Sequence, residues 1–317
     1  MFSYKAPFSC PEGWALVPND PLFNTGDFCV MKWEAKMDAN NDGLGNYPEG
    51  DYDHCSNCSG LWKYGCDPDP SCIGTIVSTA EGMPISSVNQ LDAISFCGSI
   101  GAQLLTNDHW MTIARNVSNN PDNWADKTIG STVSSDGGLF RGNVNLNDSA
   151  SCGSNTPLDG LTEGTNCIVN NTHHTDRNKR VLILDNGEEI WDFSGNLWQW
   201  TNDVIDLTPD GPPKFNDDGS SSTSDAWHDY YPEGGSGRYI DRNNLGTLGL
   251  DAKDLFLDGN YNANHGVGRI YLLNSATNRA FRRGGTWNNG THAGVLSLRL
   301  LLDSSRASSY FGLRCFK

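Results

Sequence analysis

No apolar run in this sequence approaches the ~18 residues that a membrane-spanning helix needs, which predicts a chain without membrane insertion. The first residues, MFSYKAPFSC, lack the basic start and apolar stretch of a secretory signal peptide. Basic residues are also scarce, because 22 Lys and Arg stand against 38 Asp and Glu and give a formal net charge of −16. This balance opposes binding to nucleic acid by the chain as a whole.

Turn residues and aromatic residues are abundant instead. The 317 residues include 35 Gly, 10 Trp, 12 Phe and 10 Tyr, although only 37% are hydrophobic. Bulky aromatic side chains supply a core, and runs rich in Gly, Asn, Asp and Ser predict surface loops. Two such runs, about 35–83 and 207–259, are expected to be loop-rich insertions.

Ten cysteines are more than a reduced cytosolic protein usually has. Four of them cluster with the spacing Cys-x2-Cys-x7-Cys-x5-Cys, and these are Cys55, Cys58, Cys66 and Cys72. That spacing can close two small disulfide loops or bind one zinc ion. Disulfides are favoured, because the other cysteines lie singly along the chain, as bridging partners would.

Hydrophobic periodicity predicts short strands and two helices. Strand character is found at 28–34, 180–184, 189–192 and 270–273. The helices are indicated by the helical spacing of Leu91, Ile94 and Cys97, and of Trp110, Ile113 and Ala114. Thr106 or Asn107 is the expected N-cap of the second helix. Near the end of the chain, the alternation in VLSLRL (residues 295–300) predicts a strand with one face in the core and the other exposed.

Four segments in this order resemble one family: PISSVNQLDAISFCGSIGAQLLTNDHWMTIARN, SGNLWQWTND, RRGGTW and FGLRC. A similar helix pair, a GN-x-W-x-W motif, an RGG-x-W motif and a terminal GFRC occur in the C-type lectin fold of formylglycine-generating enzymes. The resemblance implies an α+β C-type lectin fold with long loop insertions, in which residues 1–317 form a single domain.

The resemblance also implies a disulfide between Cys97 and Cys315, which would tie the last strand to the body of the domain. Closing so long a loop stabilises a fold by ~3 to 5 kcal/mol. Structural roles are expected for the motif residues, with Trp198, Trp200 and Trp287 in the core and Gly195, Gly284 and Gly285 in tight turns.

Catalysis is disfavoured by the residues that come after the RGG motif. Enzymes of this kind need a reactive cysteine pair there to bind copper and activate oxygen. The matching stretch, TWNNGTHAGVLSLRL, contains no cysteine. Related sulfoxide-forming enzymes use a histidine cluster for iron, but the adjacent pair His173 and His174 lies in a polar loop typical of a solvated turn. A formylglycine-generating-type oxidase therefore stays an alternative, as does a calcium-dependent carbohydrate-binding lectin.

The closing segment, about 283–315, is similar to the variable region of proteins diversified by retroelements. In that family, copying errors at adenines change asparagine codons into other codons. The amino acids that these codons can encode exclude Lys, Glu, Gln, Met and Trp. The resemblance implies variable, ligand-binding positions at Thr286, Asn288, Asn289, His292, Arg299, Leu301, Leu302, Arg306, Ser308 and Tyr310, none of which holds an excluded residue. It implies fixed positions at Arg283, Gly284, Gly285, Trp287, Gly290, Ala293, Gly294, Leu298, Leu300, Gly312 and Arg314.

A non-catalytic binder with a hypervariable C-terminal surface is thus the predicted function. Its partners would be diverse macromolecular ligands, chiefly proteins of a host or a cell surface. Its expected location is a virion or a cell surface. Leu301 and Leu302 offer apolar contacts on this surface, although ordinary core positions would explain them too.

This function requires no cofactor. Sequence patterns nevertheless suggest that the protein could bind calcium. DANNDGLGNYPE has the spacing of a calcium loop, with ligands from Asp38, Asn40, Asp42, Leu44 and Glu49, and it fits an acidic surface turn equally well. The family resemblance implies a second site formed by Asp192, the carbonyls of Gly195 and Leu197, and Gln199. A neutral Gln199 where a glutamate is common weakens that site.

Overall fold

The computed structural model describes residues 9–38, 41, 43–45, 75–80, 82, 84–135, 137–144, 179–205, 226–230, 239–240, 263–272 and 278–317. Short strands and two α-helices make up these residues, so the expected α+β class is confirmed. Several residues singled out by sequence patterns lie outside this described part. They are Asn40, Asp42, Glu49, Cys55, Cys58, Cys66, Cys72, His173 and His174.

The beginning and the end of the described chain meet in a four-stranded sheet with the order β1-β2-β15-β5. Its strands are β1 (Trp14–Val17), β2 (Phe28–Met31), β15 (Cys315–Phe316) and β5 (Gln103–Leu104). β15 lies antiparallel between β2 and β5, with Phe316 opposite Val30 and Cys315 opposite Leu104. The strand expected at 28–34 is therefore present, although shorter, and it holds the end of the chain.

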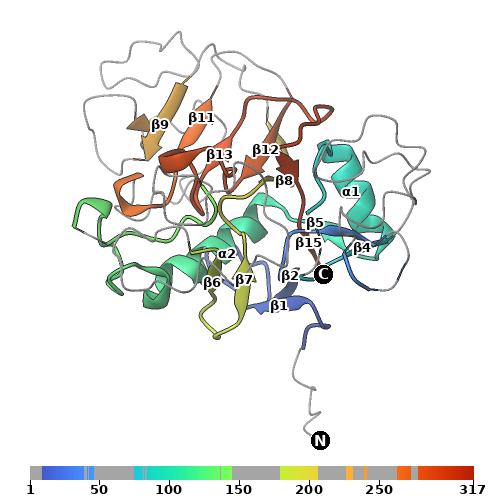
Figure 1. Ribbon diagram of the computed structural model, residues 1–317, viewed down its shortest axis with the longest axis horizontal. Helices are drawn as coiled ribbons and strands as arrows, with labels where there is room; N and C mark the ends of the chain where they lie inside the picture. Colours follow the sequence, from blue (N-terminus) through green and yellow to red (C-terminus); the bar gives the residue numbers. More distant parts are fainter. Residues whose placement is uncertain are drawn as a thin grey trace, which may run out of the picture.

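The closing segment enters a seven-stranded sheet with the order β10-β9-β11-β13-β12-β8-β14. Figure 1 shows β9, β11, β13, β12 and β8 side by side. In sheet order the bounds are β10 (Tyr239–Ile240), β9 (Ala226–Tyr230), β11 (Ile270–Leu272), β13 (Leu298–Arg299), β12 (Arg279–Arg283), β8 (Trp198–Ile205) and β14 (Phe311–Gly312). Strand β8, which contains the WQW motif, thus pairs with β12 and with β14, where the other two motifs lie.

Both ranges expected to be loop-rich insertions contain regular structure. Within 35–83, β3 (Lys36–Asp38) pairs antiparallel with β4 (Thr75–Val77). Within 207–259, β9 and β10 pair in parallel at the edge of the seven-stranded sheet. Composition predicts loops there from local preference, whereas pairing with strands far along the chain decides the conformation. A further antiparallel pair, β6 (Val181–Ile183) with β7 (Glu189–Trp191), confirms the strands expected at 180–184 and 189–192.

Helix α1 (Gln90–Ser99) buries a different face from the one its sequence predicts. Its buried residues are Gln90, Ala93 and Cys97. The helix indicated by the spacing of Leu91, Ile94 and Cys97 is confirmed, although Leu91 and Ile94 are 58% and 37% exposed. The Gln90 side-chain amide donates a hydrogen bond to the carbonyl of Thr201 on β8, and this contact helps to turn Gln90 inward.

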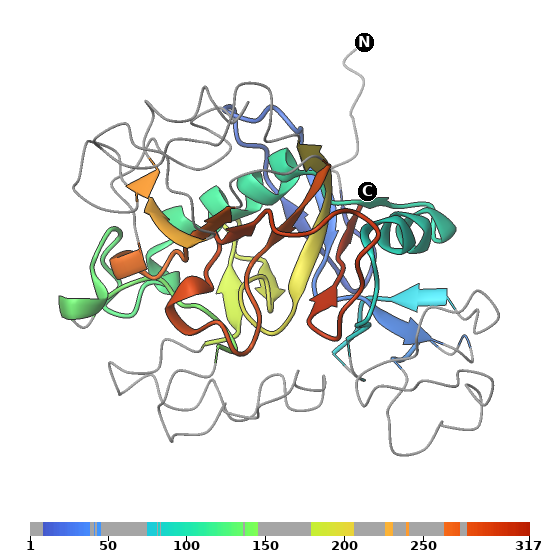
Figure 2. The ribbon, with the colours of Figure 1, turned by 90° about the horizontal axis from the view of Figure 1, so that it is seen from above.

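Helix α2 (Asn107–Asn119) begins after Thr106, whose hydroxyl accepts the His109 N–H, so the N-cap prediction is confirmed. Trp110, Ile113 and Ala114 are fully buried, as their spacing predicts. In both ribbon views α2 crosses the body of the molecule and α1 lies at its side (Figures 1 and 2). Neither described helix is long and apolar enough to span a membrane.

Hydrophobic clusters cover both faces of the seven-stranded sheet. On β12, Phe281 belongs to the cluster that contains Trp110 of α2. The neighbouring Ala280 belongs to the cluster that contains Cys97 of α1 and Trp200 of β8. Successive residues of β12 therefore point to opposite faces, as a strand between two packed layers requires.

The disulfide implied by the family resemblance is confirmed. Cys97 and Cys315 form a bond with Cα atoms 5.5 Å apart and a sequence separation of 218. A second disulfide joins Cys10 to Cys29 with a separation of 19. The first bond fastens β15 to α1, so the last residues of the chain are held at both β2 and α1.

Candidate binding surface

The closing segment begins with a tight turn after β12. Gly284 and Gly285 have φ values of +88° and +91°, which only glycine adopts without strain. A Cβ on Gly285 would lie 2.4 Å from the Cβ of Ala293. The predicted tight turn is confirmed, and it lets two parts of the closing segment touch through their backbones.

Arg283 fixes this turn to the helical layer. It is fully buried, and its Nε donates to the Asn107 side-chain oxygen at the start of α2 at 3.0 Å. Its Nη1 donates to the Leu296 carbonyl at 3.1 Å. The RGG motif therefore has a structural role, since Arg283 binds both the first residue of α2 and the loop that precedes β13.

Strand β13 confirms most of the predicted alternation. Leu296, Leu298 and Leu300 are at most 1% exposed, and Arg299 between them is partly exposed. Ser297 departs from the pattern because it is fully buried. Its hydroxyl donates to the carbonyl of His292 at 2.7 Å, so the loop before β13 folds over it.

Burial separates the positions expected to vary from those expected to be fixed. Among the expected variable positions, Asn288, Arg306 and Tyr310 are exposed. Partial exposure is found at Asn289, His292, Arg299, Leu301, Leu302 and Ser308. Thr286 does not reach the surface, so its expected place there is wrong: it is 2% exposed and its hydroxyl donates to the Asn196 carbonyl at 2.8 Å.

Most of the expected fixed positions are buried. These are Arg283, Gly284, Gly285, Ala293, Gly294, Leu298, Leu300, Gly312 and Arg314. Gly290 and Trp287 are partly exposed. The expectation that Trp287 is a core residue is therefore wrong, whereas Trp198 and Trp200 are fully buried as expected. Trp287 lies beside Tyr310, with ring centroids 5.8 Å apart.

A second aromatic group brings His292 and Arg299 together. The His292 ring stacks on Trp227 of β9 with centroids 4.4 Å apart and an interplanar angle of 12°. The Arg299 guanidinium lies over the same Trp227 ring at 5.9 Å and over Tyr271 of β11 at 5.2 Å. We call these four residues the aromatic group.

Trp227 and Tyr271 are the residues that sequence reasoning misses. Trp227 lies in the range 207–259, where composition suggests loops, and Tyr271 lies in an expected strand with no assigned role. The only local signal is an aromatic run, AWHDYY, inside a polar stretch. Their position beside Arg299 depends on β11 pairing with both β9 and β13, which no short sequence window contains.

The remaining predicted residues lie around the loop from Leu300 to β14. Leu302 packs against the hydrophobic cluster that contains Cys97 of α1. Part of its side chain therefore behaves as a core residue. Arg306 forms an exposed pair with Asp303 at 3.9 Å, a kind of ion pair that adds little stability.

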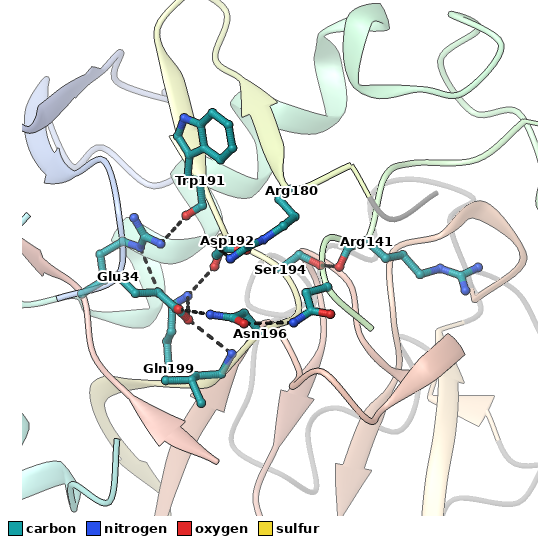
Figure 3. Close-up of polar contacts among 11 residues, drawn as sticks. Glu34, Arg141, Arg180, Trp191, Asp192, Ser194, Asn196 and Gln199 are labelled. Atoms are coloured by element: carbon teal, nitrogen blue, oxygen red, sulfur yellow. Dashed lines mark hydrogen bonds and ion pairs between the residues drawn. The ribbon is translucent and has the colours of Figure 1, made fainter. Parts of the chain in front are cut away.

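A buried polar network surrounds the GN-x-W-x-W motif (Figure 3). Arg180 binds both carboxylate oxygens of Asp192, with two contacts of 2.7 Å and both side chains fully buried. Gln199 donates to Glu34 at 3.3 Å and its side-chain oxygen accepts from Arg314 at 3.0 Å. Arginine side chains therefore bind the two side chains, Asp192 and Gln199, that the family resemblance assigns to calcium.

Glu34 adds a buried carboxyl group to this network. Its carboxyl oxygens accept the Asn196 side-chain amide at 2.6 Å and the Leu197 N–H at 3.3 Å. Burial and the nearby Asp192 raise the pKa of Glu34 to about 8, although Arg314 lowers it. The Glu34 carboxyl oxygens are thus held by N–H donors of the protein, and calcium at this motif stays a prediction.

The first calcium candidate is described only in part. The Asp38 carboxylate accepts the Gly43 N–H at 2.9 Å, a contact that a calcium loop and an acidic turn share. Asn40, Asp42 and Glu49 lie outside the described residues, so this loop stays a prediction. In the part of the chain that is described, no three His, Cys, Asp or Glu side chains come together as a metal site.

The GN-x-W-x-W, RGG-x-W and FGLRC segments thus meet in one α+β structure closed by the Cys97–Cys315 disulfide, which defines a protein of the C-type lectin-like class. The sequence matches the model of the sulfatase-modifying factor enzyme 1-like domain over residues 49–317. The chain belongs to that family.

Among solved structures, the chain is similar to two variants of the Major Tropism Determinant. The I1 variant is 14% identical, with a TM-score of 0.36. The matched region covers 97% of this chain and 52% of that chain. The P3c variant is 13% identical with the same TM-score and coverage. The chain therefore spans about half the length of these proteins.

A third similar structure is Treponema denticola variable protein 1. It is 11% identical with a TM-score of 0.35, and 95% of this chain covers 90% of that chain. No curated protein matches the sequence.

Proposed function

We propose that this protein is a non-catalytic binder whose closing segment presents a hypervariable surface to diverse ligands, chiefly proteins of a host or a cell surface. The observation that carries the proposal is the division by burial. Ala293, Leu298 and Leu300 are fully buried, whereas every expected variable position except Thr286 reaches the surface.

Physical chemistry explains why this division permits variation. Exposed substitutions away from special backbone positions usually change stability by within about ±0.5 kcal/mol. The closing segment is held meanwhile by buried contacts: Arg283 to α2, Arg314 to Gln199 and Cys315 to Cys97. Exposed side chains can therefore be exchanged while the backbone that positions them stays fixed.

The closing segment also supports a binding role through its chemistry. Arg and Tyr are enriched at the energetic centres of protein interfaces, and Arg299, Arg306 and Tyr310 reach the surface. The stretch after the RGG motif contains no cysteine for oxygen chemistry. The cysteines of the described residues all form disulfides, which supports display outside a reducing compartment, on a virion or a cell surface.

Sequencing the gene and its neighbourhood in many isolates tests the proposal. We expect a reverse transcriptase gene and a near-copy of the closing segment rich in asparagine codons. Differences between isolates should fall on Asn288, His292, Arg306 and Tyr310 and spare the buried Leu298. Differences spread evenly over buried and exposed positions, with no such gene nearby, would contradict it.

A further inference from the structure

Two arginines face each other across neighbouring strands at the edge of the aromatic group. Arg282 of β12 is the direct antiparallel partner of Arg299 of β13. Directly opposed residues point to the same face of a sheet and lie close enough to interact. Like charges in this position repel, so the pair is destabilising unless a negative group joins it.

Arg282 lacks a polar partner for its charge in the described part of the chain. It is fully buried, yet its Nε, Nη1 and Nη2 atoms all lack a hydrogen-bond partner there. Its guanidinium lies over the rings of Phe311 at 4.3 Å and Trp200 at 5.1 Å. Such contacts offset only part of the cost of removing the charge from water.

Arg299, which reaches the surface, also lacks hydrogen-bond partners for part of its guanidinium group. Its side chain is partly exposed over Trp227 and Tyr271, while its Nε is buried without a hydrogen-bond partner among the described residues. Other buried arginines have polar partners, since Arg180 pairs with Asp192 and Arg314 binds Gln199. Among the described residues, Arg282 has all three guanidinium nitrogens buried without a hydrogen-bond partner, whereas Arg141 has two such nitrogens and Arg180 has one.

No described acid compensates the two charges. Burial and the Arg299 charge lower the pKa of Arg282 well below its ordinary range, and burial lowers the pKa of Arg299. From residue 271 to 317 the only acidic residue is Asp303, and it pairs with Arg306. Among the described residues, the surface around Arg299 is thus a local positive site on a chain whose net charge is −16.

We infer that Arg299, with Arg282 beneath it, binds a carboxylate of the recognised protein, from an Asp or Glu side chain or a chain end. A guanidinium donates two parallel hydrogen bonds to a planar carboxylate. The rings of Trp227 and Tyr271 shield such a pair from water and strengthen it, and the buried Arg282 charge adds attraction from below. The inference rests on the proposed function only in assigning the carboxylate to the recognised ligand.

Acetate serves as the probe for this site. Thermal unfolding of the whole chain is followed at neutral pH while sodium acetate replaces sodium chloride at constant ionic strength. We expect acetate to raise the Tm of the parent protein by about 1 to 3 °C at saturation. Arg299→Gln should abolish the rise, whereas the matched control Arg306→Gln should keep it, because the Arg306 side chain is exposed and pairs with Asp303.

Arg282→Met separates a binding role from a structural one. Replacing an uncompensated buried charge by an apolar side chain of similar length is expected to leave the chain folded, with a Tm equal to or above the parent's. Its acetate affinity should nevertheless fall several-fold. Equal responses to acetate and chloride in the parent, a retained response in Arg299→Gln, or an undiminished affinity in Arg282→Met would each overturn the inference.

Phosphate in place of acetate distinguishes the two common oxyanions. A stronger response to phosphate would overturn the assignment to a carboxylate. The acetate titration involves no variation of the closing segment, so its failure leaves the isolate survey intact. If the isolate survey fails but acetate still raises the Tm, Arg299 and Arg282 would form a carboxylate site of fixed specificity.

Discussion

The Arg314 guanidinium joins the end of the chain to Met31 and to the stretch 191–199. It donates to the backbone carbonyls of Met31 and Trp191 and to the side-chain oxygen of Gln199. Arg306 belongs to the same segment, but its side chain is 68% exposed and its one ion pair is long. Two arginines of one segment thus differ in kind, because the first maintains the fold and the second is free to change.

His109 provides a prediction at the residue scale. Its ring lies in the first turn of α2 with centroids 4.7 Å from Phe28 and 3.8 Å from Phe316. Burial lowers the pKa of His109 to about 4. Because this value is below that of the unfolded chain, the unfolded state binds more protons between about pH 6.5 and pH 4, and stability is lost as the pH falls through that range.

Urea unfolding of the parent and of His109→Gln at about pH 7 and about pH 5 checks this prediction. The parent should lose more unfolding free energy than the variant when the pH is lowered, because Gln does not titrate. Parallel losses in both proteins would show that His109 keeps an ordinary pKa in the folded state.

Several elements of the molecule are joined where the closing segment ends. β15 pairs with β2 and β5, and its Cys315 is bonded to Cys97 of α1. The backbone of Lys317 exchanges two hydrogen bonds with Cys29, at 2.8 and 2.9 Å. The end of the closing segment is therefore held by elements that precede it by most of the chain.

The two disulfides allow a matched comparison at this scale. In the chain-entropy model, a sequence separation of 218 predicts a stabilisation of ~5 kcal/mol for Cys97–Cys315, against ~3 kcal/mol for the separation of 19 in Cys10–Cys29. Denaturant unfolding of the two double alanine variants measures both losses. An equal or larger loss without Cys10–Cys29 would show that the long loop adds no constraint.

At the scale of the whole molecule, the sequence predicts those features that depend on short segments or on a family resemblance. The N-cap at Thr106, the buried face of β13 and the Cys97–Cys315 bond are of this kind. Trp227 beside Arg299, and the unpartnered charge of Arg282, depend on the pairing of strands from distant ranges. Local patterns cannot specify such neighbours, because several registers would bury the same hydrophobic residues.

Burial also corrects two assignments that the family resemblance and its motifs suggest within the closing segment. Thr286 and Trp287 are adjacent, but the hydroxyl of Thr286 bonds the Asn196 carbonyl inside while the Trp287 ring lies beside the exposed Tyr310. In an irregular turn, backbone geometry and not period decides which side chain faces outward. We therefore expect Trp287 to take part in ligand contact and Thr286 to remain constant.

A pair of displayed libraries tests the central claim most directly. One library varies the outward positions Asn288, Asn289, His292, Arg306, Ser308 and Tyr310 with the codons reachable from asparagine by adenine changes. The other varies the buried positions Gly285, Ala293, Leu298, Leu300, Gly312 and Arg314 with the same codons. The measurement is the fraction of members that remain resistant to protease at a temperature just below the parent's Tm.

We expect most members of the outward library to remain resistant, since exposed changes shift stability by about ±0.5 kcal/mol each. The buried library should be almost entirely cleaved, because its changes remove packing and introduce strain. Similar losses in the two libraries would contradict the claim that this fold holds its closing segment independently of the side chains it presents.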